Sequence, residues 1–312
     1  MKIIRGFANL NNQFTQCVLT LGNFDGLHLG HQQLINQLVT QGKKLNLPTV
    51  VMLFEPQPLE FFGSDKAPPR LTSFREKYLL LQSFNIDYLL VIPFNQHFAN
   101  MGAVEFIEQG IIRQLNAKYV IVGDDFCFGI HRQGNVALLQ DYAEKAFFEL
   151  VCMSTYIIDQ LRVSSTAVRK ALANDDFNLA SRLLGRPYVI QGYVVHGNQL
   201  ARQLGFPTAN IWLNRRKPAV HGVYFVKISD HYSRQQYYGI ANIGIRPTVN
   251  GTTAILEVNI FDFSGNIYGH CLAIEFIEKI RNEFKFDSLT ALQRQIAQDI
   301  CIAKQIQAKF MQ

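Results

Sequence analysis

The hydrophobic pattern changes once along the chain, and this change constrains the fold more than any other feature. Up to about residue 182, short apolar runs alternate with amphipathic helical patterns. Continuous apolar runs of this length predict strands that are covered on both faces, as in a parallel sheet with helices on each side. The first part therefore predicts a parallel α/β domain. Its expected strands are residues 17–21, 49–54, 88–92, 119–123 and 147–152.

A helix is predicted over residues 32–41. Leu34, Ile35, Leu38 and Val39 recur at helical spacing, and Gly42 stands where a helix C′ residue is expected.

After about residue 186 the pattern becomes strands separated by Gly, Pro and Asn turns, which predicts an antiparallel barrel or sandwich. A last helix follows, in which Leu289, Leu292, Ile296 and Ile300 share one face and either Asp287 or Ser288 is the N-cap. We expect two domains, residues 1–182 and 183–312. The expected strands of the second domain are residues 188–195, 222–228, 237–242, 254–261 and 271–276.

Composition limits the class of protein. No apolar run approaches the ~18 residues of a membrane-spanning helix, and the N-terminus has no secretory pattern, so we expect a cytoplasmic protein without membrane contact. The five cysteines show no close pairing and are expected to be reduced, buried thiols. The net charge of +6 is dispersed, which favours anionic small substrates over nucleic acid. Nothing in the sequence predicts the oligomeric state.

The first candidate site is LTLGNFDGLHLGHQQLI, in which a buried strand runs through a glycine-rich turn into a helix. Such a turn points backbone N–H groups and a helix N-terminus at a phosphate. His28 and His31, three residues apart, can reach the same anion. Alternatives are one structural and one solvated histidine, or zinc, although no third ligand lies nearby at metal spacing.

Two other segments could join a phosphate site. In VSSTAVRKAL, Ser164 or Ser165 can cap a helix that also carries Thr166 and Arg169, although such a cap alone is usually structural. In VGDDFCFG, Asp125 follows the end of a predicted strand. It is therefore expected at the carboxyl edge of the parallel sheet, where ligands bind.

The second candidate site lies in LGFPTANI and AILEVNIF. Pro207 favours an extended segment, so that Thr208 and Asn210 point to one side and can share a Mg²⁺ ion with ATP phosphates; an ordinary turn is the alternative. Strand alternation places Glu257 and Asn259 opposite Leu256, Val258 and Ile260. Glu257 is therefore either solvated or a base that can deprotonate a primary hydroxyl.

These motifs and their order resemble the bacterial bifunctional riboflavin kinase/FAD synthetase family. GNFDGLHLGH, FEPQPLEFF, GDDFCFG and VSSTAVR resemble its FMN adenylyltransferase domain, a branch of the HxGH nucleotidyltransferases, and NIGIRPTVNGT, LEVNIFDFSGNIYG and IRNEFKF its kinase domain. The resemblance implies a Rossmann-like nucleotidyltransferase domain followed by a six-stranded Greek-key β-barrel with a C-terminal helix. It implies transfer of phosphate from ATP to riboflavin, then of the adenylyl group to FMN, giving FAD and pyrophosphate.

The resemblance also implies residue roles. His28 and His31 would stabilise the triphosphate, Glu257 would be the kinase base, Thr208 and Asn210 would hold Mg²⁺ and ATP, and Arg281 would border the flavin. The remaining residues implied to contact ATP or flavin are Gly22, Asn23, Phe24, Asp25, Gly26, Asp125, Ser164, Ser165, Thr166, Arg169, Gly205 and Pro207.

The sequence departs from the family pattern at four positions: Gln57, Cys127, Ala201 and Asn259. The first two put flavin contacts in question, and Ala201 the conformation of the phosphate loop. Two other functions remain open: a nucleotidyltransferase with another phosphorylated acceptor, and a flavin-binding or RNA-binding regulator.

Overall fold

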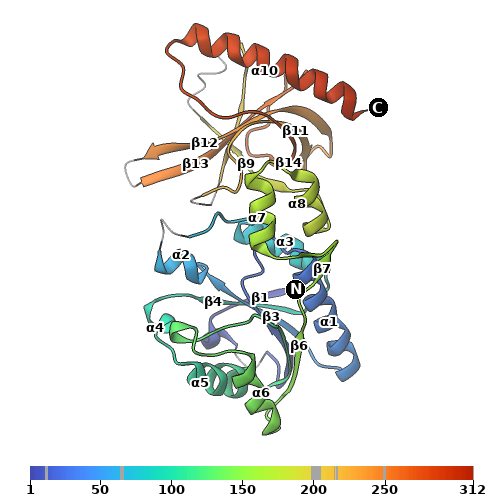
Figure 1. Cartoon of the computed structure of the whole chain (residues 1–312), viewed down its shortest axis with the longest axis vertical. Helices are drawn as coiled ribbons and strands as arrows, with labels where there is room; N and C mark the ends of the chain where they lie inside the picture. Colours follow the sequence, from blue (N-terminus) through green and yellow to red (C-terminus); the bar gives the residue numbers. More distant parts are fainter. Residues whose placement is uncertain are drawn as a thin grey trace. The chain divides into compact units, whose positions relative to one another are not determined.

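The computed structural model describes residues 1–10, 13–63, 67–197, 205–213, 215, 217–248 and 251–311. The chain forms two compact units, and the first contains Met1–Pro68 with Lys77–Ser164. The second contains Pro69–Glu76 with Ser165–Gln312 (Figure 1). The division between residues 182 and 183 into two functional domains stays a prediction. No helix in the described ranges is long and apolar enough to cross a membrane.

The first unit is built on a six-stranded sheet in which every pairing is parallel, as predicted. Its strands are β1 (Lys2–Arg5), β2 (Cys17–Leu21), β3 (Thr49–Glu55), β4 (Tyr88–Pro93), β5 (Ala117–Gly123) and β6 (Glu149–Met153). The strand order is β1-β4-β3-β2-β5-β6, so the chain proceeds from β2 to one side through β3 and later to the other side through β5. In open parallel sheets, ligands bind at the carboxyl ends of the strands where the strand order reverses, which here are β2 and β5.

Helices and one small hairpin complete this unit, and one of the helices, α3, begins in the second unit. The helical segments are η1 (Phe7–Asn9), α1 (Leu29–Leu45), α2 (Pro58–Phe62), α3 (Phe74–Gln82), α4 (Gln96–Ala99), α5 (Ala103–Glu105), η2 (Phe106–Gln114), η3 (Ile130–Arg132) and α6 (Val136–Glu144). The hairpin pairs β7 (Ile157–Ile158) with β8 (Leu161–Arg162).

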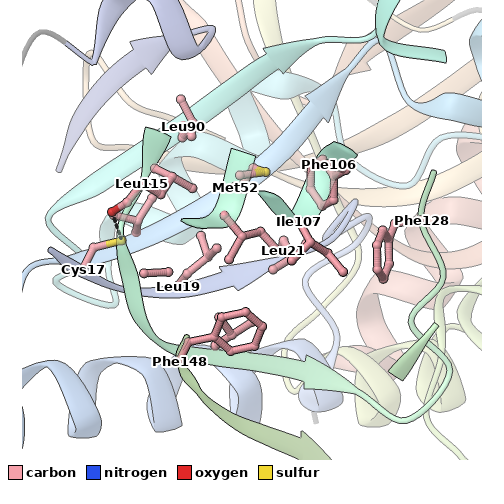
Figure 2. Packing of buried hydrophobic residues seen from close by; sticks show 14 of the residues in the cluster. Cys17, Leu19, Leu21, Met52, Leu90, Phe106, Ile107, Leu115, Phe128 and Phe148 are labelled. Atoms are coloured by element: carbon pink, nitrogen blue, oxygen red, sulfur yellow. Dashed lines mark hydrogen bonds between the residues drawn. The ribbon is translucent and has the colours of Figure 1, made fainter. Parts of the chain in front are cut away.

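The core of the first unit lies between the sheet and its helices. Figure 2 shows Leu19 and Leu21 of β2 with Met52, Phe106 and other apolar residues around them, all buried. Close packing of this kind excludes water from the sheet and gives the strand ends a fixed framework.

The predicted burial of the cysteines is correct only in part. Cys17 is fully buried and donates a 3.5 Å hydrogen bond to the Leu115 carbonyl, and burial raises the pKa of its thiol (Figure 2). Cys152 and Cys301 are exposed, which corrects the expectation. All five are free thiols.

The predicted end of the first long helix is also wrong. α1 continues through Gly42 to Leu45, and Asn46 adopts the left-handed conformation at its C-cap. Gly42 is required for packing instead, because a Cβ atom there would lie 2.4 Å from Thr49 Cγ2. A glycine inside a helix and one beyond its end look alike in sequence.

The second unit contains a closed antiparallel barrel with the order β10-β13-β12-β11-β14-β9. Its strands are β9 (Val189–Val195), β10 (Ala209–Trp212), β11 (Gly222–Asp230), β12 (Gln236–Thr248), β13 (Gly251–Ile260) and β14 (Cys271–Arg281). Its helices are α7 (Ser165–Ala173), α8 (Phe177–Leu184) and α10 (Leu289–Phe310). The alternative of a sandwich is thereby excluded.

Helix α10 packs on the outside of the barrel against β11, β12 and β14. Ser288 is its N-cap, accepting a 3.1 Å hydrogen bond from the Ala291 N–H, which decides between the two predicted caps. Leu289 is 55% exposed, so the predicted apolar face does not extend to the first residue of the helix.

A buried ion pair holds the segment Pro69–Glu76 in the second unit. The Arg215 guanidinium donates to the Glu76 carboxylate, and the two side chains are 1% and 5% exposed. Glu76 also accepts hydrogen bonds from the backbone N–H groups of Ser73 and Gln191. The buried carboxylate is therefore paired with a guanidinium and hydrogen-bonded, as a buried charge requires.

Candidate functional site

The glycine-rich loop follows β2 at the point where the strand order reverses. Phe24, Gly26 and Leu27 have positive φ angles of 47°, 80° and 44°. The side chains of Phe24 and Leu27 are each 1% exposed, and this burial offsets the backbone strain of two non-glycine residues. Lys77 of α3 is fully buried. It donates a 2.6 Å hydrogen bond to the Asn23 carbonyl and so holds the loop against α3.

The other predicted residues of this loop contribute backbone geometry and a buried carboxyl. The N–H of Gly22 donates to the Met52 carbonyl at 3.1 Å, which ties the loop to β3. Asp25 is 2% exposed. The sequence pattern did not indicate Lys77, since a lysine within the charged run REK normally faces solvent.

His28 and His31 lie together at the N-terminus of α1, as predicted. Their rings are stacked, with centroids 3.6 Å apart, and His28 is the helix N-cap, its Nδ1 accepting the His31 N–H at 3.3 Å. An accepting Nδ1 requires the proton of the neutral ring to be on Nε2, which is then a donor. A Cβ atom on Gly30 would approach the His28 ring to 3.3 Å, and the edge of the Phe24 ring packs against His31. Two imidazoles and a helix N-terminus thus form a site suited to a phosphate.

Two aspartates follow β5, the neighbour of β2 in the sheet. Asp124 is bound by the N–H and hydroxyl of Thr155, so it has a structural role in shaping the strand end. Asp125 pairs with Arg162, and both side chains are largely exposed. An exposed ion pair of this kind contributes little stability, and Asp125 stays accessible to a ligand.

The predicted serine-rich helix divides between the two units. Ser164 is the last residue of the first unit, and α7, with Ser165, Thr166 and Arg169, belongs to the second. Arg169 Nε donates a 2.7 Å hydrogen bond to the Pro69 carbonyl. A common phosphate site for this helix and the two histidines stays a prediction.

The second candidate site lies in the barrel, in the segment that leads into β10. Pro207, Thr208 and Asn210 line a pocket of about 420 Å³ together with the loop after β13. Asn259 is 8% exposed, and its Nδ2 donates a 2.9 Å hydrogen bond to the Pro207 carbonyl, so this departure from the family pattern holds the segment in place. Gly205 has φ +88°, which explains the glycine at the preceding turn.

Asn210 is held by close contacts. The side chain is 8% exposed, and a Cβ atom on Gly197 would come within 2.4 Å of its amide. Ala201 lies outside the described residues, so the predicted effect of that departure stays a prediction.

The barrel register aligns Asn210 with Glu257. The two residues are directly opposed on β10 and β13, which places their side chains on one face. Leu256 and Val258 are fully buried on the other face, as the strand alternation predicted.

Arg281 lies at the end of β14, and its guanidinium is engaged by protein groups. Its Nε and Nη2 donate to the carboxylate of Asp299, which is 1% exposed, and its Nη1 donates to the Asn282 carbonyl. The guanidinium carbon lies 4.6 Å from the centroid of the Phe284 ring. Arg281 therefore joins β14 to α10, and its predicted position beside the flavin stays a prediction.

The other two residues that depart from the family pattern, Gln57 and Cys127, lie in the first unit. Gln57, 6% exposed, precedes α2 and forms a capping box with Glu60, whose carboxylate accepts the Gln57 N–H at 3.1 Å. Cys127 is half-buried, and its thiol is 3.6 Å from the Asp125 carbonyl.

The donor set at the second site fits Mg²⁺ bound together with a nucleotide. In the described part of the chain, no group of three or more His, Cys, Asp or Glu side chains is arranged to hold a metal. Thr208 and Asn210 instead offer two neutral oxygens at one pocket. Mg²⁺ accepts such a small protein contribution when phosphate and water oxygens supply the other ligands.

Comparison with known proteins identifies the family. Residues 10–167 match the FAD synthetase family model, and residues 184–307 match the riboflavin kinase family model. A bifunctional riboflavin kinase/FMN adenylyltransferase of Haemophilus influenzae is 47% identical over 304 residues, covering 97% of this chain and 98% of that protein. The protein of the same description in Escherichia coli K12 is 46% identical over 306 residues, covering 98% and 97%.

A solved structure supports the same fold. A Streptococcus pneumoniae protein described as a macrolide-efflux protein has a TM-score of 0.77 and 31% identity, covering 97% of this chain and 99% of that one. The family resemblance seen in the motifs is confirmed: the chain belongs to the bifunctional riboflavin kinase/FMN adenylyltransferase family.

Proposed function

We propose that the chain converts riboflavin to FMN and FMN to FAD, using one ATP for each step. The observation that carries this proposal is that both family models match the one chain, over residues 10–167 and 184–307. Riboflavin, FMN, FAD and ATP are its small-molecule partners, and the cytoplasm is its proposed location.

Adenylyl transfer is assigned to the loop after β2 and the N-terminus of α1. A phosphate oxygen of FMN attacks the α-phosphorus of ATP, the bond to the bridging oxygen breaks, and pyrophosphate leaves. The nucleophile is already an anion, so the step needs alignment and charge stabilisation more than a general base. Nε2–H of His28, the stacked ring of His31 and the helix N-terminus can stabilise the negative charge on the triphosphate.

Phosphoryl transfer is assigned to the barrel. The 5′-hydroxyl oxygen of riboflavin attacks the γ-phosphorus of ATP, its proton passes to the Glu257 carboxylate, and ADP leaves. Thr208 and Asn210 would hold Mg²⁺, which supplies charge neutralisation for the ATP phosphates when bound. This assignment is supported by the register, in which Asn210 and Glu257 are directly opposed on neighbouring strands.

Two incubations test the proposal. The purified protein is mixed with ATP and Mg²⁺, once with riboflavin and once with FMN, and the flavins are separated by chromatography. FMN followed by FAD in the first mixture, and FAD in the second, is the expected result. FAD from supplied FMN alone would remove the kinase assignment, and binding of flavin without conversion in either mixture would favour a regulator.

Two variants assign the reactions to their sites. Glu257→Gln is expected to abolish FMN formation while adenylylation of supplied FMN continues. His28→Ala is expected to have the opposite effect. Loss of both activities from either change in a folded protein would contradict two independent sites.

A further inference from the structure

Glu257 is flanked by an amide side chain on each side. Asn210 of β10 and Asn242 of β12 are both directly opposed to it across the sheet. Opposed residues of antiparallel strands share a face, with Cβ atoms about 4.5 to 5.5 Å apart. Asn210 belongs to the pocket with Thr208, so Asn242 lies on the other side of the base from the proposed nucleotide position.

The Asn242 amide has a defined orientation. Its Nδ2 donates to Glu283 Oε1 at 3.3 Å, and only the NH₂ end of an amide can donate to a carboxylate. Gly244, two residues along β12, makes this contact possible, because a Cβ atom there would lie 2.3 Å from the same Glu283 oxygen. The other end of the amide, Oδ1, is thereby turned away from Glu283.

Oδ1 of Asn242 is buried and accepts no hydrogen bond from any described residue. Leaving a buried carbonyl oxygen without a donor costs free energy, and native proteins rarely do so without a reason. The missing group must be a hydrogen-bond donor. An alcohol qualifies, and Glu257 beside it is already assigned to the proton of one alcohol.

We propose that Asn242 Oδ1 accepts a hydrogen bond from the 4′-hydroxyl of the ribityl chain and so helps to select the acceptor. This inference rests on the proposed role of Glu257. Two hydroxyls on neighbouring carbons bind side by side, the 5′-hydroxyl at Glu257 and the 4′-hydroxyl at Asn242. Bound in this way, the 5′-oxygen is directed toward the nucleotide side of the strand, where the γ-phosphate is transferred.

The test compares riboflavin with 4′-deoxyriboflavin as phosphoryl acceptors. Asn242→Leu keeps the approximate size of the side chain and removes the acceptor. For riboflavin we expect kcat/KM of the variant to fall roughly ten- to a hundredfold, as for loss of a buried hydrogen bond. For the wild type, kcat/KM should be lower with 4′-deoxyriboflavin than with riboflavin by a similar factor. For the variant, kcat/KM should be the same with both flavins.

Controls separate the possible failures. Adenylylation of FMN by the same Asn242→Leu preparation should be unchanged, and its thermal unfolding, compared with that of the wild type, reports whether the barrel is folded. Gln236→Leu, at the exposed start of the same strand, should change neither activity. If Asn242→Leu does not fold, Asn242→Ala is measured in the same way. A variant that still prefers riboflavin by the wild-type factor would overturn the inference. Continued phosphorylation by Glu257→Gln would instead show that the proposed base is wrong.

Discussion

Nδ1 of His28 accepts the backbone N–H of His31, while the two imidazole rings stack 3.6 Å apart. One side chain therefore has two separable functions. Its Nδ1 caps α1, and its Nε2 is the ring nitrogen that we propose donates to a phosphate.

Substitution at position 28 separates these functions. Asparagine is a good N-cap but has no equivalent of Nε2, so His28→Asn should keep the stability of the chain and slow adenylylation about a hundred- to a thousandfold. His28→Ala should slow it equally and also destabilise the first unit by about 0.5 to 2 kcal/mol. Steady-state adenylylation of FMN and denaturant unfolding measure the two effects. Equal unfolding midpoints for the two variants would contradict the capping role.

Much of this site could be predicted from the sequence, because it depends on local order. A buried strand, a glycine turn and a helix follow one another within residues 17–45, and the two histidines are three residues apart. The helix start was placed too late, since histidine is an uncommon N-cap, and the helix end was placed too early at Gly42.

Features that depend on distant contacts could not be predicted. Lys77 reaches the Asn23 carbonyl from 54 positions away, and Arg215 pairs with Glu76 across 139 positions. In the sequence, Lys77 and Arg215 belong to ordinary charged stretches that give no sign of these contacts. Strand β1 was also missed, because only Ile4 among its four residues is buried and so gives little apolar signal.

Gly197 should matter to the kinase reaction alone. A Cβ atom there would overlap the Asn210 amide at 2.4 Å, so Gly197→Ala must displace either the loop or the side chain proposed to hold the nucleotide. We expect riboflavin phosphorylation to fall at least about tenfold, with adenylylation unchanged. The matched control is Gly102→Ala, at a glycine with φ −66° and no atom within 4 Å of the added carbon. Equal rates for both variants would show that Asn210 tolerates the displacement.

The buried pair of Arg215 and Glu76 should be a main determinant of stability in the second unit. Arg215→Met removes the guanidinium that pairs with the buried Glu76 carboxylate, and breaking such a pair costs about 3 to 5 kcal/mol. The denaturation midpoint of the riboflavin kinase activity measures the loss. Lys304→Met, which removes an exposed partner 3.8 Å from Asp262, should change stability by less than about 1 kcal/mol. Similar shifts for the two variants would contradict the importance of burial.

Asp230 should make the stability of the barrel depend on acid pH. Burial of this carboxyl opposes its ionisation, but hydrogen bonds from the Ser233 hydroxyl, the His270 ring and the Tyr232 N–H outweigh burial and hold its pKa below the ordinary 3.8. The folded state therefore binds this proton less readily than the unfolded chain does. The resulting stabilisation is complete above pH 3.8 and disappears as the pH falls through the lower folded value.

Asp230→Asn removes this titration. At pH 7 the variant should be less stable by about 1 to 3 kcal/mol, because the amide cannot replace a carboxylate that accepts three hydrogen bonds. As the pH falls below 3.8, the wild type should lose its advantage and the two unfolding midpoints should converge. Asp262→Asn, at a side chain 87% exposed, controls for a change of net charge and should track the wild type at every pH. A constant difference between wild type and Asp230→Asn down to the acid limit would mean that Asp230 stabilises the turn after β11 through packing alone, because only an ionised carboxylate gives a contribution that protonation removes.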